Sequence, residues 1–217
     1  MDNFYEVEVF IDVEPSRIWS ALTDRVELGR WFGWDAGTLA DEINTFFFEH
    51  AVPDAGRMRL DFPGMEDMYI EVAPLEAASV IRAVQPGDGQ EFYAEIREGW
   101  IGFFHQLKRY IEDHPGQDRK TVYLSGTGVA AEVAPALAGR LPGRDWFSGE
   151  QTRVIATESF GPGLGVLLAS GGLESTEGGK LTFTLSTWGL SEGELTELSA
   201  DWLSWWSGLV EGAEVVT

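Results

Sequence analysis

The sequence predicts an α+β fold class, in which an antiparallel sheet and a long C-terminal helix occur in two tandem copies. Three observations support this prediction. The chain opens with a strand pattern, continues through short β-type runs bounded by Pro, Gly and Asp, and reaches a long amphipathic helix near residue 100. The same order of elements then returns in the second half. A chain of 217 residues can form two small domains of roughly 100 residues each.

The first predicted elements are one strand and two helices. Apolar and mainly polar residues alternate over residues 5–13, the period-2 pattern of a strand with one buried face. Pro15 can begin a helix, because the first turn does not need its missing N–H group. The apolar positions of the two helices are Ile18, Trp19 and Leu22, then Leu28, Trp31 and Phe32.

The middle of the first half is predicted to be an antiparallel meander. Its strands are Ile43–Glu49, Arg57–Phe62, Met68–Ala73 and Ser79–Val84. Glu91–Arg97 either adds a strand or begins the next helix. From Trp100 to Ile111, apolar residues recur at i, i+3, i+4, i+7 and i+11, which indicates one face of a helix. That helix should end before His114-Pro115-Gly116.

The second half repeats this order. A shift of 115 residues places Val7 on Val122, Leu22 on Leu137 and the pair Trp31-Phe32 on Trp146-Phe147. The final helices are only 102 residues apart, from Trp100 to Trp202, so we expect a reduced second sheet of about four strands. The predicted domains are residues 1–116 and 120–217. The predicted elements of the second are strands Thr121–Ser125, Thr152–Ser159, Leu164–Ser170 and Leu181–Thr187, and helices Ala130–Leu137 and Leu195–Leu209.

Four features of the first half resemble the family of homologues of the activator of heat-shock-protein ATPase. They are the strand Val7–Val13, the Pro-initiated helix Pro15–Leu22, the run Gly29-Arg30-Trp31-Phe32, and Gly99-Trp100 at the start of a long helix. This family belongs to the START-like (SRPBCC, birch-pollen-allergen-like) superfamily. The resemblance therefore implies the helix-grip fold, a curved antiparallel sheet around one long C-terminal helix, with the second domain a reduced helix-grip-like copy.

The helix-grip fold implies a cavity between the sheet and the long helix. By position, the candidate ligand-binding residues are Trp31, Phe32, Trp100, Phe103, Phe104 and Leu107. A concave and largely apolar pocket is typical of small-molecule sites. The alternative is that these side chains fill the space as ordinary core. In the second domain, Trp202, Trp205 and Trp206 are bulky enough to fill the corresponding space, so little or no cavity is expected there.

Charge and composition exclude several classes of protein. The net charge is −21, and such a surface repels nucleic acid and anionic membranes. There is no cysteine, which excludes disulfides, thiolate metal sites and a cysteine nucleophile. The first residues show neither the basic nor the apolar segment of a signal peptide, and no apolar run is long enough to span a bilayer. A cytoplasmic location is expected.

The sequence contains no recognisable catalytic constellation. The three histidines, His50, His105 and His114, have no metal-ligand spacing, and no serine lies in a G-x-S-x-G motif, so neither a metal nor a cofactor is expected. One motif competes. The strand before Gly126-Thr127-Gly128 and the helix after it have the outline of a dinucleotide-binding turn. The elements that follow do not alternate as βα units, which argues against that reading.

Our leading hypothesis is a non-enzymatic binding protein. It would take an apolar small molecule in the cavity of the first domain or a protein partner on its sheet, and the family resemblance implies a co-chaperone or stress-related role. One alternative is an enzyme of the polyketide-cyclase type, which would place polar groups in the same cavity. A second alternative is that the tandem arrangement serves as a structural or dimerisation module. In that case the chain could form a homodimer.

Overall fold

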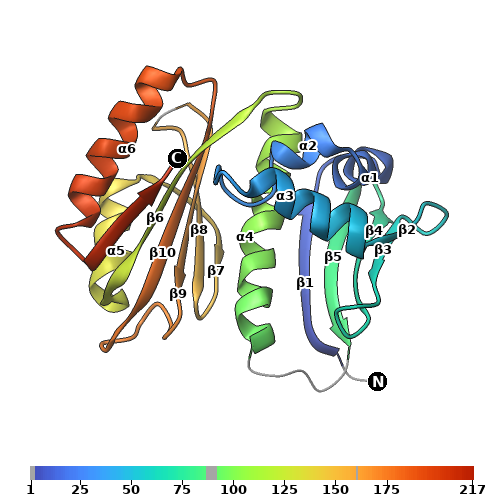
Figure 1. The fold of residues 1–217 in the computed structure, drawn as a ribbon, viewed down its shortest axis with the longest axis horizontal. Coiled ribbons are helices and arrows are strands. Elements are labelled where there is room, and N and C mark those ends of the chain that lie inside the picture. Colours follow the sequence, from blue (N-terminus) through green and yellow to red (C-terminus); the bar gives the residue numbers. More distant parts are fainter. Residues whose placement is uncertain (1–2, 87–91, 160) are drawn as a thin grey trace. The chain divides into compact units, whose positions relative to one another are not determined.

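The computed structural model describes residues 3–86, 92–159 and 161–217. Figure 1 shows these residues as helices and two sheets, and they divide into two compact units. The first unit comprises the chain up to Gly33 together with Thr38–Gly116. The second comprises Gln117–Thr217 and also the short segment Trp34–Gly37. This segment lies within the first half of the chain, where no sequence pattern indicates a change of unit.

The first unit is a five-stranded antiparallel sheet with helices. Its strands have the order β1-β5-β4-β3-β2. The helix α1 begins at Pro15 as predicted, and the Asp24 carboxylate caps α2 by accepting hydrogen bonds from the N–H groups of Val26 and Glu27. The elements are β1 (Asn3–Ile11), α1 (Pro15–Thr23), α2 (Arg25–Gly29), α3 (Leu39–Ile43), the π-helix η1 (Asn44–His50), β2 (Val52–Asp54), β3 (Arg59–Phe62), β4 (Met68–Leu75), β5 (Ala78–Pro86) and α4 (Phe92–Asp113).

One predicted strand of this unit is wrong. Residues 43–49 are helical, because they span the end of α3 and most of η1. Three consecutive phenylalanines favour a strand by propensity, but Ile43 and Phe47 are four residues apart and both are buried. The Phe47 ring packs 4.9 Å from the Phe32 ring and 6.1 Å from the Trp31 ring, measured between centroids. Tertiary packing of one helical face therefore overrides the local preference.

The second unit contains a larger sheet than the sequence predicted. Its six strands have the order β11-β6-β10-β9-β8-β7, so the expectation of a reduced sheet with four strands is wrong. The missed strands are β7 and β11, whose mixed and mostly exposed residues do not alternate in hydropathy. Trp146 and Phe147 lie on β7, whereas Trp31 and Phe32 follow α2. The elements are β6 (Arg119–Val129), α5 (Ala130–Arg140), β7 (Gly143–Ser148), β8 (Thr152–Thr157), β9 (Gly163–Ala169), β10 (Gly178–Trp188), α6 (Glu192–Trp206) and β11 (Glu211–Val216).

The two sheets share a strand order and a register. The order β1-β5-β4-β3-β2 in the first unit corresponds to β6-β10-β9-β8-β7 in the second. Val7 on β1 pairs with Ala83 on β5, and Val122 on β6 pairs with Leu185 on β10. Val122 lies 115 residues after Val7, and Leu185 lies 102 residues after Ala83, the same two offsets that the sequence shows. The offsets of 115 and 102 residues, found in the sequence from helix and aromatic positions, therefore also relate the paired strand residues of the two sheets.

A long helix covers each sheet. In the first unit α4 packs against β1. Lys108 Nζ of α4 donates to the Phe10 carbonyl of β1 at 2.9 Å, and Glu112 accepts from the N–H of Asp12, just after the strand, at 2.8 Å. In the second unit Trp202 and Trp206 of α6 are buried with Phe183 of β10 in one apolar core. An antiparallel sheet with a long C-terminal helix is consistent with a helix-grip fold. Among the described residues, no helix is long and apolar enough to cross a membrane.

The segment Trp34–Gly37, which we call the strap, is bonded to β6 within the second unit. The Trp34 ring stacks on the Tyr123 ring, with centroids 4.2 Å apart and planes 13° from parallel. The Asp35 N–H donates to Thr121 Oγ1 at 2.7 Å, and the Thr121 N–H donates to Asp35 Oδ2 at 2.8 Å. Arg119 is buried, and burial lowers its pKa to about 10, although the nearby Asp35 charge acts in the opposite direction.

The two glycines of the suspected dinucleotide motif have a packing role instead. A Cβ on Gly126 would lie 2.4 Å from Val210 Cγ2, and one on Gly128 would lie 3.0 Å from Val210 Cγ1. Both glycines lie on β6, which pairs antiparallel with β10 and β11. A dinucleotide turn instead joins a strand of a parallel sheet to a helix. The dinucleotide reading is therefore wrong, and the glycines allow close packing of the chain beside Val210.

Candidate functional site

The five aromatic residues of the predicted site form one cluster in the first unit, and the sixth residue, Leu107, is buried on α4. The Phe32 ring lies 4.8 Å from the Phe103 ring and 6.3 Å from the Trp100 ring, and Trp100 lies 5.2 Å from Phe104. These centroid distances are those of aromatic rings in contact. Trp31 is held at its polar end, because its Nε1 donates to the Ala21 carbonyl at 3.0 Å. Of the six, all except Phe103 are buried.

A groove opens beside this cluster, with a volume of about 580 Å³. Phe32 is the member of the predicted set that lines it. Phe32, Phe46 and Met65 supply the apolar part of the wall, and we call this pocket the α3 groove. Its lining residues are Phe32, Thr38, Asp41, Glu42, Thr45, Phe46, His50, Gly64 and Met65. The volume lies in the range of roughly 300–1,000 Å³ that is usual for small-molecule pockets.

The helical segment from α3 to η1 forms one wall of the α3 groove. Positions 38, 41, 42, 45 and 46 share one helical face, because residues three and four apart are neighbours on a helix. The Phe46 ring is placed against the Phe62 ring at 4.5 Å and the Trp100 ring at 5.6 Å. π-Helical segments are rare and frequently occur at functional sites. Because Phe46 lines the groove and its ring also contacts Phe62 and Trp100, this segment connects the groove to the buried aromatic cluster.

The opposite wall comes from the turn between β3 and β4. Its Met65 N–H donates to the Phe62 carbonyl at 2.9 Å, and the buried Gln85 side chain donates to the Glu66 carbonyl at 3.1 Å. Glu66 and Asp67 have positive φ angles of 51° and 62°, a conformation that residues other than glycine rarely adopt. The hydrogen bond from Gln85 helps to hold the turn, and with it Met65, in this conformation.

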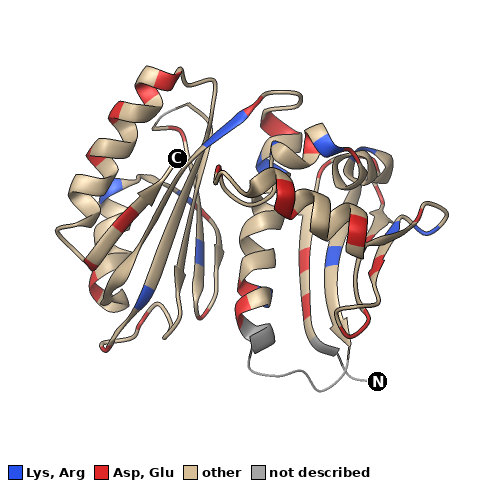
Figure 2. Ribbon diagram, viewed as in Figure 1, with Lys and Arg blue, Asp and Glu red and all other residues tan. Residues whose placement is uncertain are grey.

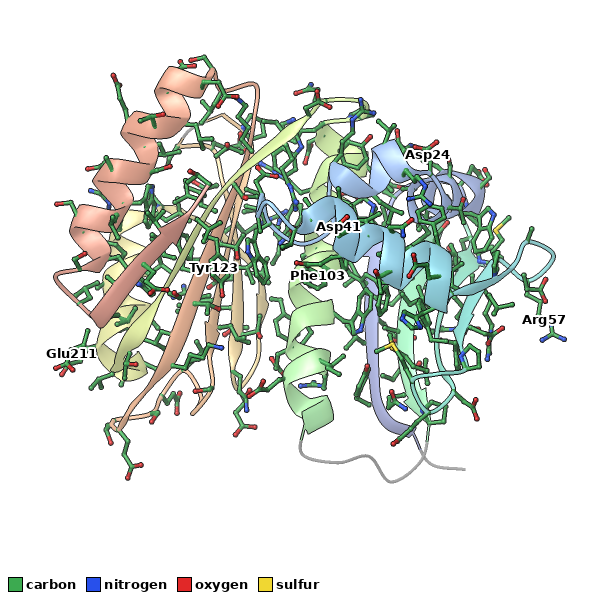
Figure 3. The ribbon with its side chains drawn as sticks, in the orientation of Figure 1. Asp24, Asp41, Arg57, Phe103, Tyr123 and Glu211 are labelled. Atoms are coloured by element: carbon green, nitrogen blue, oxygen red, sulfur yellow. The ribbon has the colours of Figure 1, made fainter. Side chains whose placement is uncertain are left out.

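The rim of the α3 groove is acidic. Asp41, Glu42 and His50 are exposed, and the described residues of the lining include two carboxylates but neither Lys nor Arg. Thr38 Oγ1 donates to Glu42 Oε1 at 2.6 Å, which fixes the orientation of that carboxylate. Figure 3 labels Asp41 on the α3 segment, and Figure 2 shows acidic residues on the same helical segment. The groove thus combines an apolar floor with a negative rim.

The sequence prediction missed most of the groove because it assigned a strand to residues 43–49. A helix over this segment would have placed Thr38, Asp41 and Thr45 on the face of Phe46. The usable signal was the run of acidic residues after Thr38, since such residues are enriched in the first turn of a helix. Met65 carried no such signal, because the turn that presents it depends on the distant Gln85.

The second unit also has a groove, although the space beneath α6 is filled. Of the three Trp residues expected to fill this space, Trp202 and Trp206 are fully buried, whereas Trp205 is only partly buried. The groove lies elsewhere, between α5 and the strands β7 and β8, and its volume is about 470 Å³. Arg153 in its wall forms two hydrogen bonds with Asp145, at 2.8 and 3.0 Å. The expectation of little or no cavity in this unit therefore holds only beneath α6.

The three histidines have different environments. His50 is exposed at the α3 groove, whereas His105 and His114 are buried. Within the described part of the chain, no group of three or more His, Asp or Glu side chains could hold a metal ion.

The pKa of buried His105 predicts a loss of stability in acid. Burial lowers this pKa below its ordinary value of 6.5, against the effect of the hydrogen bond between Nδ1 and the Ile101 carbonyl, 2.7 Å away. The unfolded chain then binds the proton more strongly, so the contribution of His105 is fully present above pH 6.5 and decreases below it. We expect His105→Gln to reduce the difference in unfolding free energy between pH 7.5 and 5.5, measured by urea denaturation. The His50→Gln control should retain the wild-type difference, and an unchanged difference in His105→Gln would contradict the prediction.

No protein-family model matches the chain, and no curated protein matches it. Two solved structures are similar at 15% identity. DynU16, a protein from the dynemicin biosynthetic locus, aligns over 95% of this chain and 96% of its own, with a TM-score of 0.36. The Aha1 dimer from Colwellia psychrerythraea aligns over 54% of this chain and 100% of its own, with a TM-score of 0.38. Both are distant similarities, and neither assigns an activity to this chain.

Proposed function

We propose that this chain is a non-enzymatic binding protein that holds an apolar small molecule in the α3 groove. The observation that carries the proposal is the groove itself, where Phe32, Phe46 and Met65 form an apolar surface of ligand-binding size. The predicted residues Trp31, Trp100, Phe103, Phe104 and Leu107 would support this surface from behind rather than contact the ligand, since nearly all of them are buried.

The proposal includes a helix-grip assignment for both units, as two tandem copies of one domain. The matching strand orders and the shared register of β1-β5 and β6-β10 support it. Because the sequence resembles the ATPase-activator homologues, the proposal also includes a co-chaperone or stress-related role for the chain. A protein partner on the sheet, a homodimer and a cyclase-type enzyme are the competing functions. The carboxylates at the groove are exposed on its rim, so we assign them an electrostatic role rather than a catalytic one.

Titration with N-phenyl-1-naphthylamine, a neutral apolar fluorophore, tests the proposal. We expect saturable binding to the full chain, with increased fluorescence of the probe. Thr45→Trp should weaken this binding by roughly tenfold or more, because an indole on the exposed rim fills the groove, and tenfold corresponds to about 1.4 kcal/mol. Thr196→Trp is the matched control, since it adds the same side chain at an exposed position of α6.

Two outcomes would contradict the proposal. If wild type shows no saturable binding, the α3 groove is not an apolar ligand site, and contact with a protein partner becomes the better account. If Thr45→Trp and Thr196→Trp bind the probe equally well, the ligand site lies elsewhere. Native mass spectrometry of the purified chain should also detect a bound small molecule. Chemical conversion of that molecule during incubation would move the protein to the enzyme class.

A further inference from the structure

We infer that the α3 groove selects ligands that join an aromatic ring system to a positively charged nitrogen, and that it discriminates against carboxylates of the same shape. This inference rests on the proposed function, because it concerns the same groove. The inference goes beyond the proposed function because it assigns a charge to the ligand. Two separate properties of the lining carry it: the sign of the charges at the rim, and the aromatic character of the floor.

The charges at the rim have one sign. Asp41 and Glu42 both line the groove, and its lining contains no Lys or Arg to neutralise them. Glu66 and Asp67 follow Met65 directly in the chain and are also exposed. Two basic side chains that precede Met65 in the sequence have acidic partners: Arg57 is paired with Asp54, and Arg59 is paired with Asp61. A carboxylate ligand would therefore meet like charge and no described cation in the groove.

The floor adds a second preference for cations. Phe32 is 8% exposed and Phe46 is partly exposed, and both rings belong to the groove lining. Aromatic faces attract cations through their quadrupole, and a ligand ring can stack on the same surface. Arg25 already lies over the ring of the neighbouring Phe48, 3.9 Å from its centroid. The phenylalanines of η1 are thus suited both to an apolar ring and to an attached ammonium group.

The Glu42 carboxylate is already oriented, which would help it to bind the ammonium group at one position. Glu42 accepts a hydrogen bond from Thr38 Oγ1 at 2.6 Å, and both residues line the groove. A carboxylate that is already oriented loses less side-chain freedom when it binds a cation. Asp41 lies beside Glu42 in the first turn of α3, so the two carboxylates are adjacent in the groove lining. The ring would occupy the apolar floor, with its nitrogen directed towards these two carboxylates.

Three probes with one ring system and different charges test the inference. They are 1-naphthylmethylamine, 1-naphthalenemethanol and 1-naphthoic acid, each titrated into the full chain by calorimetry at pH 7.5 and low salt. We expect the amine to bind about tenfold more tightly than the alcohol, as a cation–π contact and an exposed ion pair together would give. The acid should bind more weakly than the alcohol. Raising the salt concentration to about 1 M should reduce the advantage of the amine, because exposed charges are then screened.

The double variant Asp41→Asn/Glu42→Gln should remove most of the advantage of the amine over the alcohol. The matched control is Glu197→Gln/Glu211→Gln, which removes two exposed carboxylates from the second unit and makes the same change in net charge. This control should retain the advantage. If the control loses it equally, the effect comes from the overall charge, and the inference is overturned.

The inference and the proposed function fail in different ways. Equal affinities for the amine, alcohol and acid would overturn the charge preference, while the groove would remain an apolar binding site. Tighter binding of the acid would also overturn it. If none of the three probes binds and N-phenyl-1-naphthylamine does not bind either, the proposed function itself is wrong.

Discussion

Replacing Asp35 by Ala is expected to lower the free energy of unfolding of the second unit by roughly 1–3 kcal/mol, the usual cost of leaving a buried donor, here the Thr121 N–H, without its hydrogen-bond acceptor. Arg119 is 5% exposed, and burial already lowers its pKa to about 10. Asp35 opposes that effect through its charge, and it also accepts a hydrogen bond from the Thr121 N–H at 2.8 Å. The substitution removes both interactions.

Hydrogen–deuterium exchange of β6 and β10, followed in increasing guanidinium chloride, measures this effect in the second unit. The control is Asp201→Ala, which breaks an exposed pair with Arg140 in the same unit. It should cost less than about 1 kcal/mol. If Asp35→Ala costs as little as this control, the strap does not stabilise β6 through the hydrogen bonds between Asp35 and Thr121.

Replacing Trp202 by Ala is expected to cost about 3–5 kcal/mol, the usual loss for a large buried aromatic side chain. Trp202 is fully buried, and its ring stacks on Phe183 with centroids 4.9 Å apart. Phe104 has the same role in the first unit, where it is fully buried beside Trp100, so Phe104→Ala should have a cost of the same size. Guanidinium chloride denaturation with circular dichroism, supported by exchange in each sheet, measures these losses.

The neighbouring Trp205 provides the matched control. It lies on the same helix, 5.4 Å from Trp202 between ring centroids, but it is only partly buried. Trp205→Ala should therefore cost clearly less than Trp202→Ala, since less apolar surface is returned to water. A cost below about 1 kcal/mol for Trp202→Ala would mean that its ring is exposed. The assignment of α6 as the helix that covers this sheet would then fail.

The strand-and-helix frame of the chain could be predicted because its signals are local. The alternation from Tyr5 to Val13 identifies β1, Pro15 marks the start of α1, and the spacing from Trp100 to Ile111 identifies the core of α4. The aromatic cluster could be predicted too, because large apolar residues on a buried face must pack together. Even the offsets of 115 and 102 residues could be read from the sequence, and they agree with the register of the paired strands.

The candidate site was decided by contacts between residues distant in sequence. Residues 43–49 have a local preference for strand, and they are helical because Phe47 packs on Trp31 and Phe32. Met65 reaches the α3 groove on a turn that Gln85 fastens from β5. Neither interaction leaves a periodic pattern in its own segment, so the groove could not be predicted from a single stretch of chain.

The sequence by itself determined which segments are strands and helices wherever a buried face imposes a period on the residues, and it determined the strongly negative charge. The tertiary structure alone decided that β7 and β11 extend the second sheet, that the strap belongs to the second unit, and that the α3 groove lies beside the aromatic cluster rather than within it. The physical reason is the range of the interactions. Periodicity reports burial along one element, whereas Asp35 meets Thr121, and Phe46 meets Trp100, only after the chain has folded.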